Sequence, residues 1–490
     1  AEPAAFTGFA RTAQGLPEQP GFAPQASWRT TLAAPLEGQQ ARVAAVWRDG
    51  EGNDTLHPAV TLTATGAFLG HVWFGGGEGA SQALMLALVG ELVPDVWRQS
   101  AERALAQVGV CGGESDFAAF RAALAKARPS RAARSALALA DAARAEAIAR
   151  LQAGAWKESL EASGRATDAA RRAWFLTRKP RANEHRAFWC HSAFGLRGKT
   201  WDESIRFLKE NGFNVILPNM LWGGIAYYPS QVLPEYEELA QRGDQIEQCL
   251  AACRKYGVAC HVWKVNWNMS GRAPKAFVER MVREGRVQKL FNGEIKESWL
   301  CPSHPDNQEL EVASMLEIVR AYDVDGVHFD YIRYPDGNAC YCEGCRARFE
   351  AKFGRPVVKW PQDTRTHDEV REAWLAFRRA NIDTVVRRVS HEARAVRTSA
   401  QISAAVFRNW PVDRDSIGQD WGMWCEQGWL DFVCPMDYVD ANVSFRNMVS
   451  TQQAYAGRVR LYPGIGLSCW KNPLDAAKLA EQIEITRELG

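Results

Sequence analysis

The chain has 490 residues, of which 47% are hydrophobic and 24% are charged, and this length predicts at least two domains with separate cores. Lys and Arg number 59 against 57 Asp and Glu, so the net charge of +2 argues against nucleic acid or an anionic membrane as the main partner. No apolar run reaches the roughly 18 residues that a membrane span needs. The most unusual count is 19 Trp against 8 Met; tryptophan suits protein cores and also stacks on sugar rings and bases.

The chain begins A-E-P-A-A-F, without an initiator Met and without a basic and apolar leader. Such a start is typical of a secreted protein after removal of its signal peptide, although an expression product would look the same. We therefore expect a secreted or periplasmic protein.

Residues 1–116 predict a small α/β accessory domain. Alternating apolar and polar residues at 41–50 and 59–74 predict strands, and A-L-M-L-A-L-V-G-E-L-V at 83–93 predicts a buried helix. The G-G-G-E-G segment at 75–79 lacks the lysine of a phosphate-binding loop and the spacing of a dinucleotide fingerprint, so we interpret it as a tight turn.

The segment 117–180 is rich in Ala and Arg with helical spacing, which predicts a helical connector of two or three helices. Its arginines alternate with Asp and Glu, a pattern that indicates a solvated helix face rather than a basic binding patch.

From residue 186 to residue 490 short apolar strands alternate with amphipathic helices, which predicts parallel strands with crossover helices. The predicted strands are A-F-W-C-H from 187, N-V-I-L-P-N from 214, V-A-C-H-V-W-K-V from 258, D-G-V-H-F-D-Y from 325, I-S-A-A-V-F from 402, D-F-V-C-P-M-D-Y from 431 and R-L-Y-P-G-I-G-L from 460. Seven units without a nucleotide fingerprint favour a (β/α)₈ TIM-type barrel over an open doubly wound sheet. An eighth strand is expected after the last helix, and the chain as given stops at Gly490, so we expect that strand to be missing.

In such a barrel the chemistry lies at the carboxyl ends of the strands, so inward polar residues there are the candidates. Side chains alternate along a strand, which places Gly326, His328 and Asp330 inward in the fourth strand. The same reasoning in the sixth strand places Phe432 outward and Asp437 inward. We therefore predict Asp330 and Asp437 as a catalytic carboxyl pair. An ion pair of Asp330 with a nearby arginine, and a capping role for Asp437, are the structural alternatives.

The remaining predicted site residues contact substrate: His191, Asn219, Trp222, Lys264, Asn266, His328, Tyr331, Arg333, Trp410 and Trp470. Two carboxylates in a cleft lined by Trp and Tyr are what glycoside hydrolysis needs, because aromatic faces hold the apolar side of each sugar ring. Two of these residues have alternatives: His328 as a hydrogen-bonded core imidazole, and Lys264 as the ion-pair partner of Asp330.

Three cysteines lie close together in C-Y-C-E-G-C at 340–345. They predict either a structural zinc ion with a fourth ligand such as Cys301 or His304, or a disulfide. For the catalytic site we predict no metal and no cofactor.

The segment D-G-V-H-F-D-Y-I-R-Y-P at 325–335 resembles the glycosyl hydrolase-like 10 family, a group of bacterial, largely exported glycosidases with barrel folds. Supporting matches are W-C-H-S-A-F-G, N-V-I-L-P-N-M, C-Y-C-E-G-C-R-A-R-F and D-F-V-C-P-M-D-Y, and the resemblance covers about residues 186–490. It implies a carbohydrate-active barrel. Asp330 and Asp437 are also similar in strand order to the nucleophile and the acid/base of retaining α-galactosidase and α-glucosidase barrels, an analogy that does not establish their roles.

The sequence thus predicts a glycoside hydrolase acting on a bacterial cell-wall, mucin-type or other polysaccharide, with retention of configuration. In this mechanism Asp330 attacks the anomeric carbon and Asp437 is the acid/base. One alternative is a non-catalytic glycan-binding barrel. The other is a metal-dependent hydrolase or deacetylase that would use His191, His261, His328 and Asp330.

Overall fold

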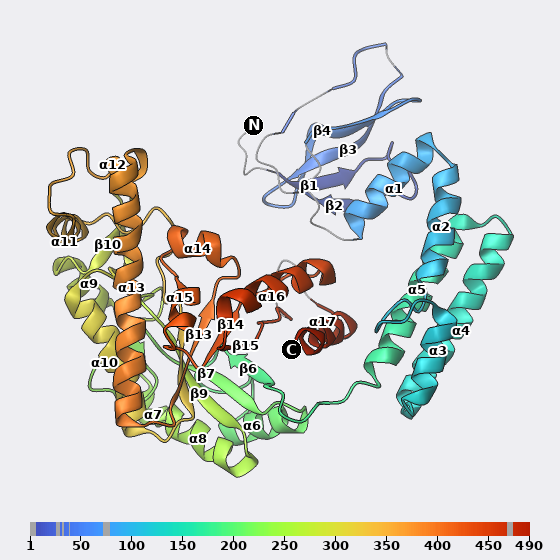
Figure 1. The fold of residues 1–490 in the computed structure, drawn as a ribbon. Helices are drawn as coiled ribbons and strands as arrows, with labels where there is room; N and C mark the ends of the chain where they lie inside the picture. Colours follow the sequence, from blue (N-terminus) through green and yellow to red (C-terminus); the bar gives the residue numbers. More distant parts are fainter. Residues whose placement is uncertain (1–5, 26–29, 32–33, 39, 72–78, 468–473) are drawn as a thin grey trace. The chain divides into compact units, whose positions relative to one another are not determined.

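A computed structural model describes residues 6–25, 30–31, 34–38, 40–71, 79–467 and 474–490. The chain forms two compact units, Ala1–Arg178 and Lys179–Gly490, each with its own core (Figure 1). Among the described residues, no helix has both the length and the apolar character that crossing a bilayer requires.

The first unit begins with a five-stranded antiparallel sheet in the order β2-β1-β3-β4-β5. Its strands are β1 (Phe6–Arg11), β2 (Phe22–Pro24), β3 (Arg42–Asp49), β4 (Asp54–Leu62) and β5 (Ala67–Leu69). Helix α1 (Ala80–Leu92) packs Leu84 and Leu88 into the same core as Phe9 and Trp47 of the sheet. The predicted turn at 75–79 falls almost entirely outside the described residues.

Four helices complete this unit, α2 (Asp95–Gln107), α3 (Phe117–Lys126), α4 (Arg131–Gln152) and α5 (Trp156–Phe175). Helices α4 and α5 pack along a row of buried alanines, because small side chains allow two helices to approach closely. Arg165 pairs with Glu146 on the exposed side, as expected for a solvated face. The segment predicted to be helical is therefore helical, and it belongs to the same compact unit as the sheet.

The second unit is a parallel sheet of seven strands in the order β15-β14-β13-β12-β9-β7-β6, the arrangement of an incomplete (β/α)₈ barrel (Figure 1). All seven predicted strands are present: β6 (Ala187–Cys190), β7 (Val215–Trp222), β9 (Ala259–Val265), β12 (Gly326–Asp330), β13 (Gln401–Val406), β14 (Phe432–Pro435) and β15 (Arg460–Leu461). The predicted fold class is confirmed.

Helices follow the strands as crossover connections: α6 (Trp201–Glu210), α8 (Gln245–Tyr256), α10 (Pro305–Ala321), α13 (Asp368–Val396), α16 (Asn442–Ala456) and α17 (Ala476–Leu489). Helix α6 shows how the sequence sets their ends. Thr200 and Glu203 form a capping box at its start, and Gly212 after its end has φ +87°, a conformation that favours glycine.

Shorter elements lie in the loops: β8 (Ile225–Ala226), α7 (Leu239–Arg242), α9 (Lys275–Arg283), β10 (Val287–Lys289), β11 (Ile295–Leu300), α11 (Glu343–Phe353), α12 (Asp363–Thr366), α14 (Trp410–Ser416) and α15 (Trp421–Glu426). Arg378 of α13 joins two of these loops. Its fully buried guanidinium donates to the carbonyl oxygens of Asp336 and Ala339 after β12, and of Asp415 and Ser416 after β13.

In β12 the residues that point into the barrel are those predicted. In β9 and β14 the prediction is wrong, because the residues predicted to point outward point inward. The rings of His261 on β9 and Phe432 on β14 are 5.1 Å apart although two strands separate them, so both point into the barrel. Lys264 therefore points outward to α10, and Asp437 continues the helix-facing side of β14. The cause is that both faces of a buried parallel strand are apolar, so hydrophobicity does not reveal which face is inward.

Candidate active site

Asp330 is the carboxyl at the end of β12, and its side chain is 6% exposed. Its Oδ1 accepts the Tyr331 amide at 2.7 Å, and its carbonyl accepts the Asn266 amide at 2.8 Å. Burial raises the pKa of Asp330 to about 6, against the opposing influence of the Tyr331 amide and the Arg333 charge. The barrel mouth, which we define as the carboxyl ends of the strands, thus holds a carboxyl that titrates near neutral pH.

Aromatic rings and one guanidinium surround this carboxyl. The Tyr331 ring lies 5.6 Å from the Trp299 ring, and the Arg333 guanidinium lies 4.8 Å from Tyr331 and 4.4 Å from the Phe407 ring. Tyr331 has φ +54°, a strained conformation for a bulky residue and one that recurs at functional sites. The predicted site residues Tyr331 and Arg333 are therefore brought together with Asp330.

Trp263, which the sequence analysis missed, forms the floor of the mouth on β9. It is buried with Leu217 and Val265 in a cluster that Trp222 and Tyr331 contact. Trp263 is the tryptophan in the predicted strand V-A-C-H-V-W-K-V. The predicted orientation of that strand was wrong and placed this side chain toward the helices.

Three further predicted residues lie next to this floor. The His191 ring is 4.8 Å from the Trp263 ring, and partial desolvation followed by the charge of Arg272 lowers the pKa of His191. Asn219 donates to the Trp263 carbonyl at 3.3 Å and accepts the Trp222 indole N–H at 2.5 Å. His191, Asn219 and Trp222 thus lie on the Trp263 side of the mouth.

His328 lies below the mouth as a hydrogen-bonded core imidazole, fully buried. Its Nε2 accepts the Trp189 indole N–H at 3.1 Å, so its Nδ1 carries the proton and donates to Ser403 Oγ at 2.8 Å. Burial holds the pKa of His328 well below its usual range. Both ring nitrogens are partnered inside the barrel, which matches the structural alternative.

Lys264 and Asn266 lie behind the sheet, and Lys264 does not pair with Asp330. The fully buried Lys264 Nζ is 3.1 Å from Glu311 of α10, and Asn266 Nδ2 donates to the same carboxylate at 2.6 Å. Burial lowers the pKa of Lys264, while Glu311 acts in the opposite direction. This network fixes α10 to the sheet.

Asp437 also lies on the helix-facing side. It is fully buried, and its Oδ1 accepts Gln452 Nε2 of α16 at 2.7 Å, whereas its Oδ2 has no hydrogen-bond partner among the described residues. Burial raises the pKa of Asp437 to about 7. The pairing of Asp330 with Asp437 stays a prediction.

Trp410 packs away from Asp330. Its indole N–H donates to Asp420 at 2.8 Å, and its ring lies 4.6 Å from Tyr455 of α16. Trp470 lies outside the described residues.

Asp413 of α14 is a second acidic residue near the mouth that the sequence analysis missed. Half-buried, it accepts the Asn409 amide at 2.8 Å, and burial raises its pKa. The charges of Asp330 and Asp413 both act on Arg333. Nothing in the sequence pattern marked Asp413, because it lies on the short helix α14 after the fifth strand, outside the alternation of that strand.

The ligand set of the metal-dependent alternative is not assembled. His261 makes an edge-to-face contact with Phe432 in the barrel interior, and His328 hydrogen-bonds to Trp189 and Ser403. Among the described residues, only cysteines gather in groups that could hold a metal ion. A separate pocket lined by His185, Phe432 and Tyr462 lies at the amino ends of the strands, opposite Asp330, and the His185 ring stacks on Tyr462.

Comparison with known proteins relates the second unit to glycoside hydrolases. The Escherichia coli K12 protein named glycosyl hydrolase DigH is 22% identical over 268 residues, which are 48% of this chain and 57% of that protein. The chain thus spans little more than half the length of this relative. An S-layer-related protein of Niallia circulans is 23% identical over 218 residues, 36% of this chain and 13% of that protein.

The glycoside hydrolase domain of PgaB (BpsB) from Bordetella bronchiseptica has a similar fold, with a TM-score of 0.50 and 16% identity over 62% of this chain and 91% of that domain. The family model described as glycosyl hydrolase-like 10 matches residues 183–475, more than half of the chain. The chain therefore belongs to the glycosyl hydrolase-like 10 family.

Proposed function

We propose that this protein is a glycoside hydrolase acting on a complex glycan, with Asp330 as its catalytic carboxyl. Family membership supports a hydrolase that acts on glycans. The observation that carries the assignment of Asp330 is its position: a nearly buried carboxyl at the end of β12, between aromatic rings and Arg333, with a pKa of about 6.

This environment suits a carboxylate that attacks or stabilises a sugar cation. With a pKa of about 6, roughly nine in ten Asp330 carboxyls are ionised at pH 7. Low solvent access strengthens the attraction between this carboxylate and the positive charge that develops on the sugar. Tyr331 and Trp299 supply apolar ring faces against which sugar rings pack.

For the second carboxyl we propose Asp413, which lies half-buried on α14, at the same end of the barrel as Asp330. The segment between β13 and α14 also supplies the Phe407 ring that the Arg333 guanidinium covers. The role of Asp437 as acid/base stays a prediction. Its raised pKa and unpartnered Oδ2 favour a proton donor, but it must turn from Gln452 toward the mouth to serve as one. Retention of configuration stays a prediction too, and NMR of the anomer first released decides it.

The substrate class we propose is a bacterial cell-wall, mucin-type or other polysaccharide. Incubation of the purified chain with peptidoglycan, mucin-type O-glycans and plant polysaccharides, followed by assay of new reducing ends, identifies it. Asp330→Asn is expected to lower turnover of the active glycan by at least about 10³-fold, since it removes the charge but keeps the shape.

Asp383→Asn is the matched control. Asp383 is a half-buried carboxyl whose pKa is also raised, to about 7, but it lies on α13 and accepts the Trp424 indole N–H at 2.6 Å. Its replacement should leave turnover within a few-fold of the unmodified chain. Equal turnover of Asp330→Asn and the unmodified chain would refute the assignment of Asp330. A non-catalytic glycan-binding barrel would bind one of these glycans and release no reducing end from any.

A further inference from the structure

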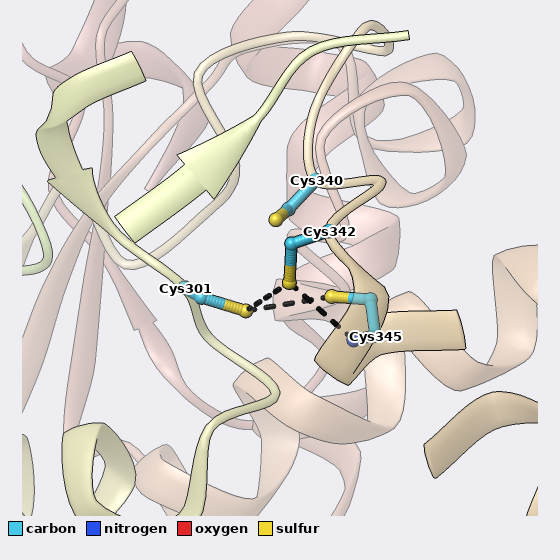
Figure 2. A group of neighbouring side chains, drawn as sticks. All are labelled: Cys301, Cys340, Cys342 and Cys345. Atoms are coloured by element: carbon cyan, nitrogen blue, oxygen red, sulfur yellow. Dashed lines mark hydrogen bonds between the residues drawn. The ribbon is translucent and has the colours of Figure 1, made fainter. Parts of the chain in front are cut away.

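Four cysteines from two separate segments meet in the second unit (Figure 2). Cys301 directly follows β11, Cys340 and Cys342 lie in the loop after β12, and Cys345 lies in the first turn of α11. All four side chains are buried. The fold thus gathers residues that are about 40 positions apart in the sequence around one point.

The sulfur separations fit a single tetrahedral metal ion. The four sulfur atoms lie within 4.8 Å of one another, with Cys301 at 3.4 Å from Cys345 and 3.8 Å from Cys342. Four sulfurs at 2.3 Å from one zinc ion are about 3.8 Å apart along each tetrahedral edge. An iron–sulfur cluster, in which several iron and sulfide atoms separate the thiolates, needs a wider site.

Backbone amides and cations around the sulfurs suit a negatively charged thiolate site. The Cys345 amide donates to Cys342 Sγ and the Lys289 amide donates to Cys340 Sγ, both at 3.4 Å. Four thiolates around Zn²⁺ carry a net charge of −2. The fully buried Arg378 donates to the Ala339 carbonyl beside Cys340, where its charge offsets part of that negative charge.

We infer that Cys301, Cys340, Cys342 and Cys345 bind one structural zinc ion. Of the two fourth ligands considered from the sequence, the fold brings in Cys301, whereas His304 caps α10 through the Asp306 amide. All four positions are filled by protein, as in structural rather than catalytic zinc sites. This inference does not depend on the proposed function.

The ion would join two segments that reach the mouth. Cys301 comes two residues after Trp299, and Cys340 ends the loop that begins with Tyr331 and Arg333. Tyr331 directly follows Asp330, and its ring lies 5.6 Å from the Trp299 ring. Zinc would therefore hold the β10–β11 hairpin against the loop after β12 and fix the distance between these rings.

A second cysteine group provides the control. Cys249 and Cys253 on α8 and Cys260 on β9 also lie within 4.8 Å of one another, but they offer only three ligands, in an apolar core. A three-cysteine group between a helix and a strand is ordinary packing of small apolar side chains.

The test is elemental analysis of the full chain, purified from zinc-containing medium without chelator. We expect about one zinc per chain, most of which is lost in Cys345→Ser and in Cys301→Ser and all of which remains in Cys253→Ser. Removal of zinc by a strong chelator should lower the melting temperature of the unmodified chain and of Cys253→Ser alike.

Alkylation of the unmodified chain followed by mass spectrometry keeps the inference testable if the serine variants fail to fold. The four cysteines should resist alkylation until the metal is released and then react as free thiols. A disulfide among the four, no stoichiometric metal, or iron in place of zinc would each overturn the zinc assignment.

Discussion

The two faces of the barrel sheet carry buried polar groups in different arrangements at the carboxyl ends of the strands. On the face toward α10 and α16, Lys264 is paired with Glu311 and Asp437 accepts a hydrogen bond from Gln452. On the mouth face, the Asp330 side chain accepts the amide of its neighbour Tyr331 and retains some exposure. The polar groups on the helix-facing side bind residues of the helices, whereas the Asp330 carboxylate can still interact with a substrate.

A raised pKa therefore does not by itself identify a catalytic carboxyl. Burial raises the pKa of Asp330, Asp437 and Asp383 alike, to about 6, 7 and 7. Only Asp330 lies beside aromatic rings and a guanidinium at the mouth. Location on the sheet, rather than titration, distinguishes the proposed catalytic carboxyl from the other two.

Replacement of one carboxyl at the mouth and one on the helix-facing side tests this difference most directly. Asp413→Asn is expected to lower kcat by about 10²- to 10⁴-fold, the usual contribution of an acid or base, and Asp437→Asn to change it by less than about threefold. Steady-state rates on the active glycan, with melting curves to confirm folding, measure both. The reverse pattern would establish Asp437 as the acid/base and remove Asp413.

On the helix face, Lys264→Met is expected to lower the free energy of unfolding by about 3–5 kcal/mol, because it leaves Glu311 buried without its cation. Denaturant titration measures the loss. Addition of Glu311→Gln to Lys264→Met should recover part of it. A loss of turnover per folded molecule would show that the helix face also serves catalysis.

The pH dependence tests the mouth face. If the ionised Asp330 reacts, kcat/KM should rise about tenfold per pH unit below its pKa of about 6 and level off above it. A raised pKa in the folded state also means that neutral Asp330 stabilises the fold at low pH and that this stability is lost as pH rises through about 6. The melting temperature of Asp330→Asn relative to that of the unmodified chain should therefore rise between about pH 4, the pKa of an unfolded Asp, and about pH 6, and level off above it. An identical pH dependence of the two melting temperatures would contradict the raised pKa.

The smallest expected effect concerns the aromatic rings of the mouth. Trp299→Ala should raise KM by up to about tenfold with kcat little changed, since a single ring contact contributes about 0.5–1.5 kcal/mol. Trp374→Phe is a control for replacement of a tryptophan that lies against Tyr341 and Phe377 in the core. Equal KM values for Trp299→Ala and the unmodified chain would exclude Trp299 from the substrate path.

The order of strands was predictable from the sequence, but the direction of side chains was predictable in only one case. In β12, the apolar residues Val327 and Phe329 share one face and pack under the helices, so the opposite face with Gly326 and His328 had to point inward. In β9 and β14 apolar residues occupy both faces, and the alternation that identifies a half-buried strand is lacking. Residues in the segments between the strands, such as Asp413, have no periodic signal at all.

Arg378 limits how the mouth can work. One guanidinium binds carbonyl oxygens of the loop after β12 and of the loop after β13, so neither loop can swing outward without breaking charge-assisted hydrogen bonds in a buried site. The two walls nearest Asp330 are therefore tied to one another. Selectivity among glycans should then arise from the shape of a pre-formed opening rather than from closure around the bound sugar, and a glycan that does not fit should be rejected at binding.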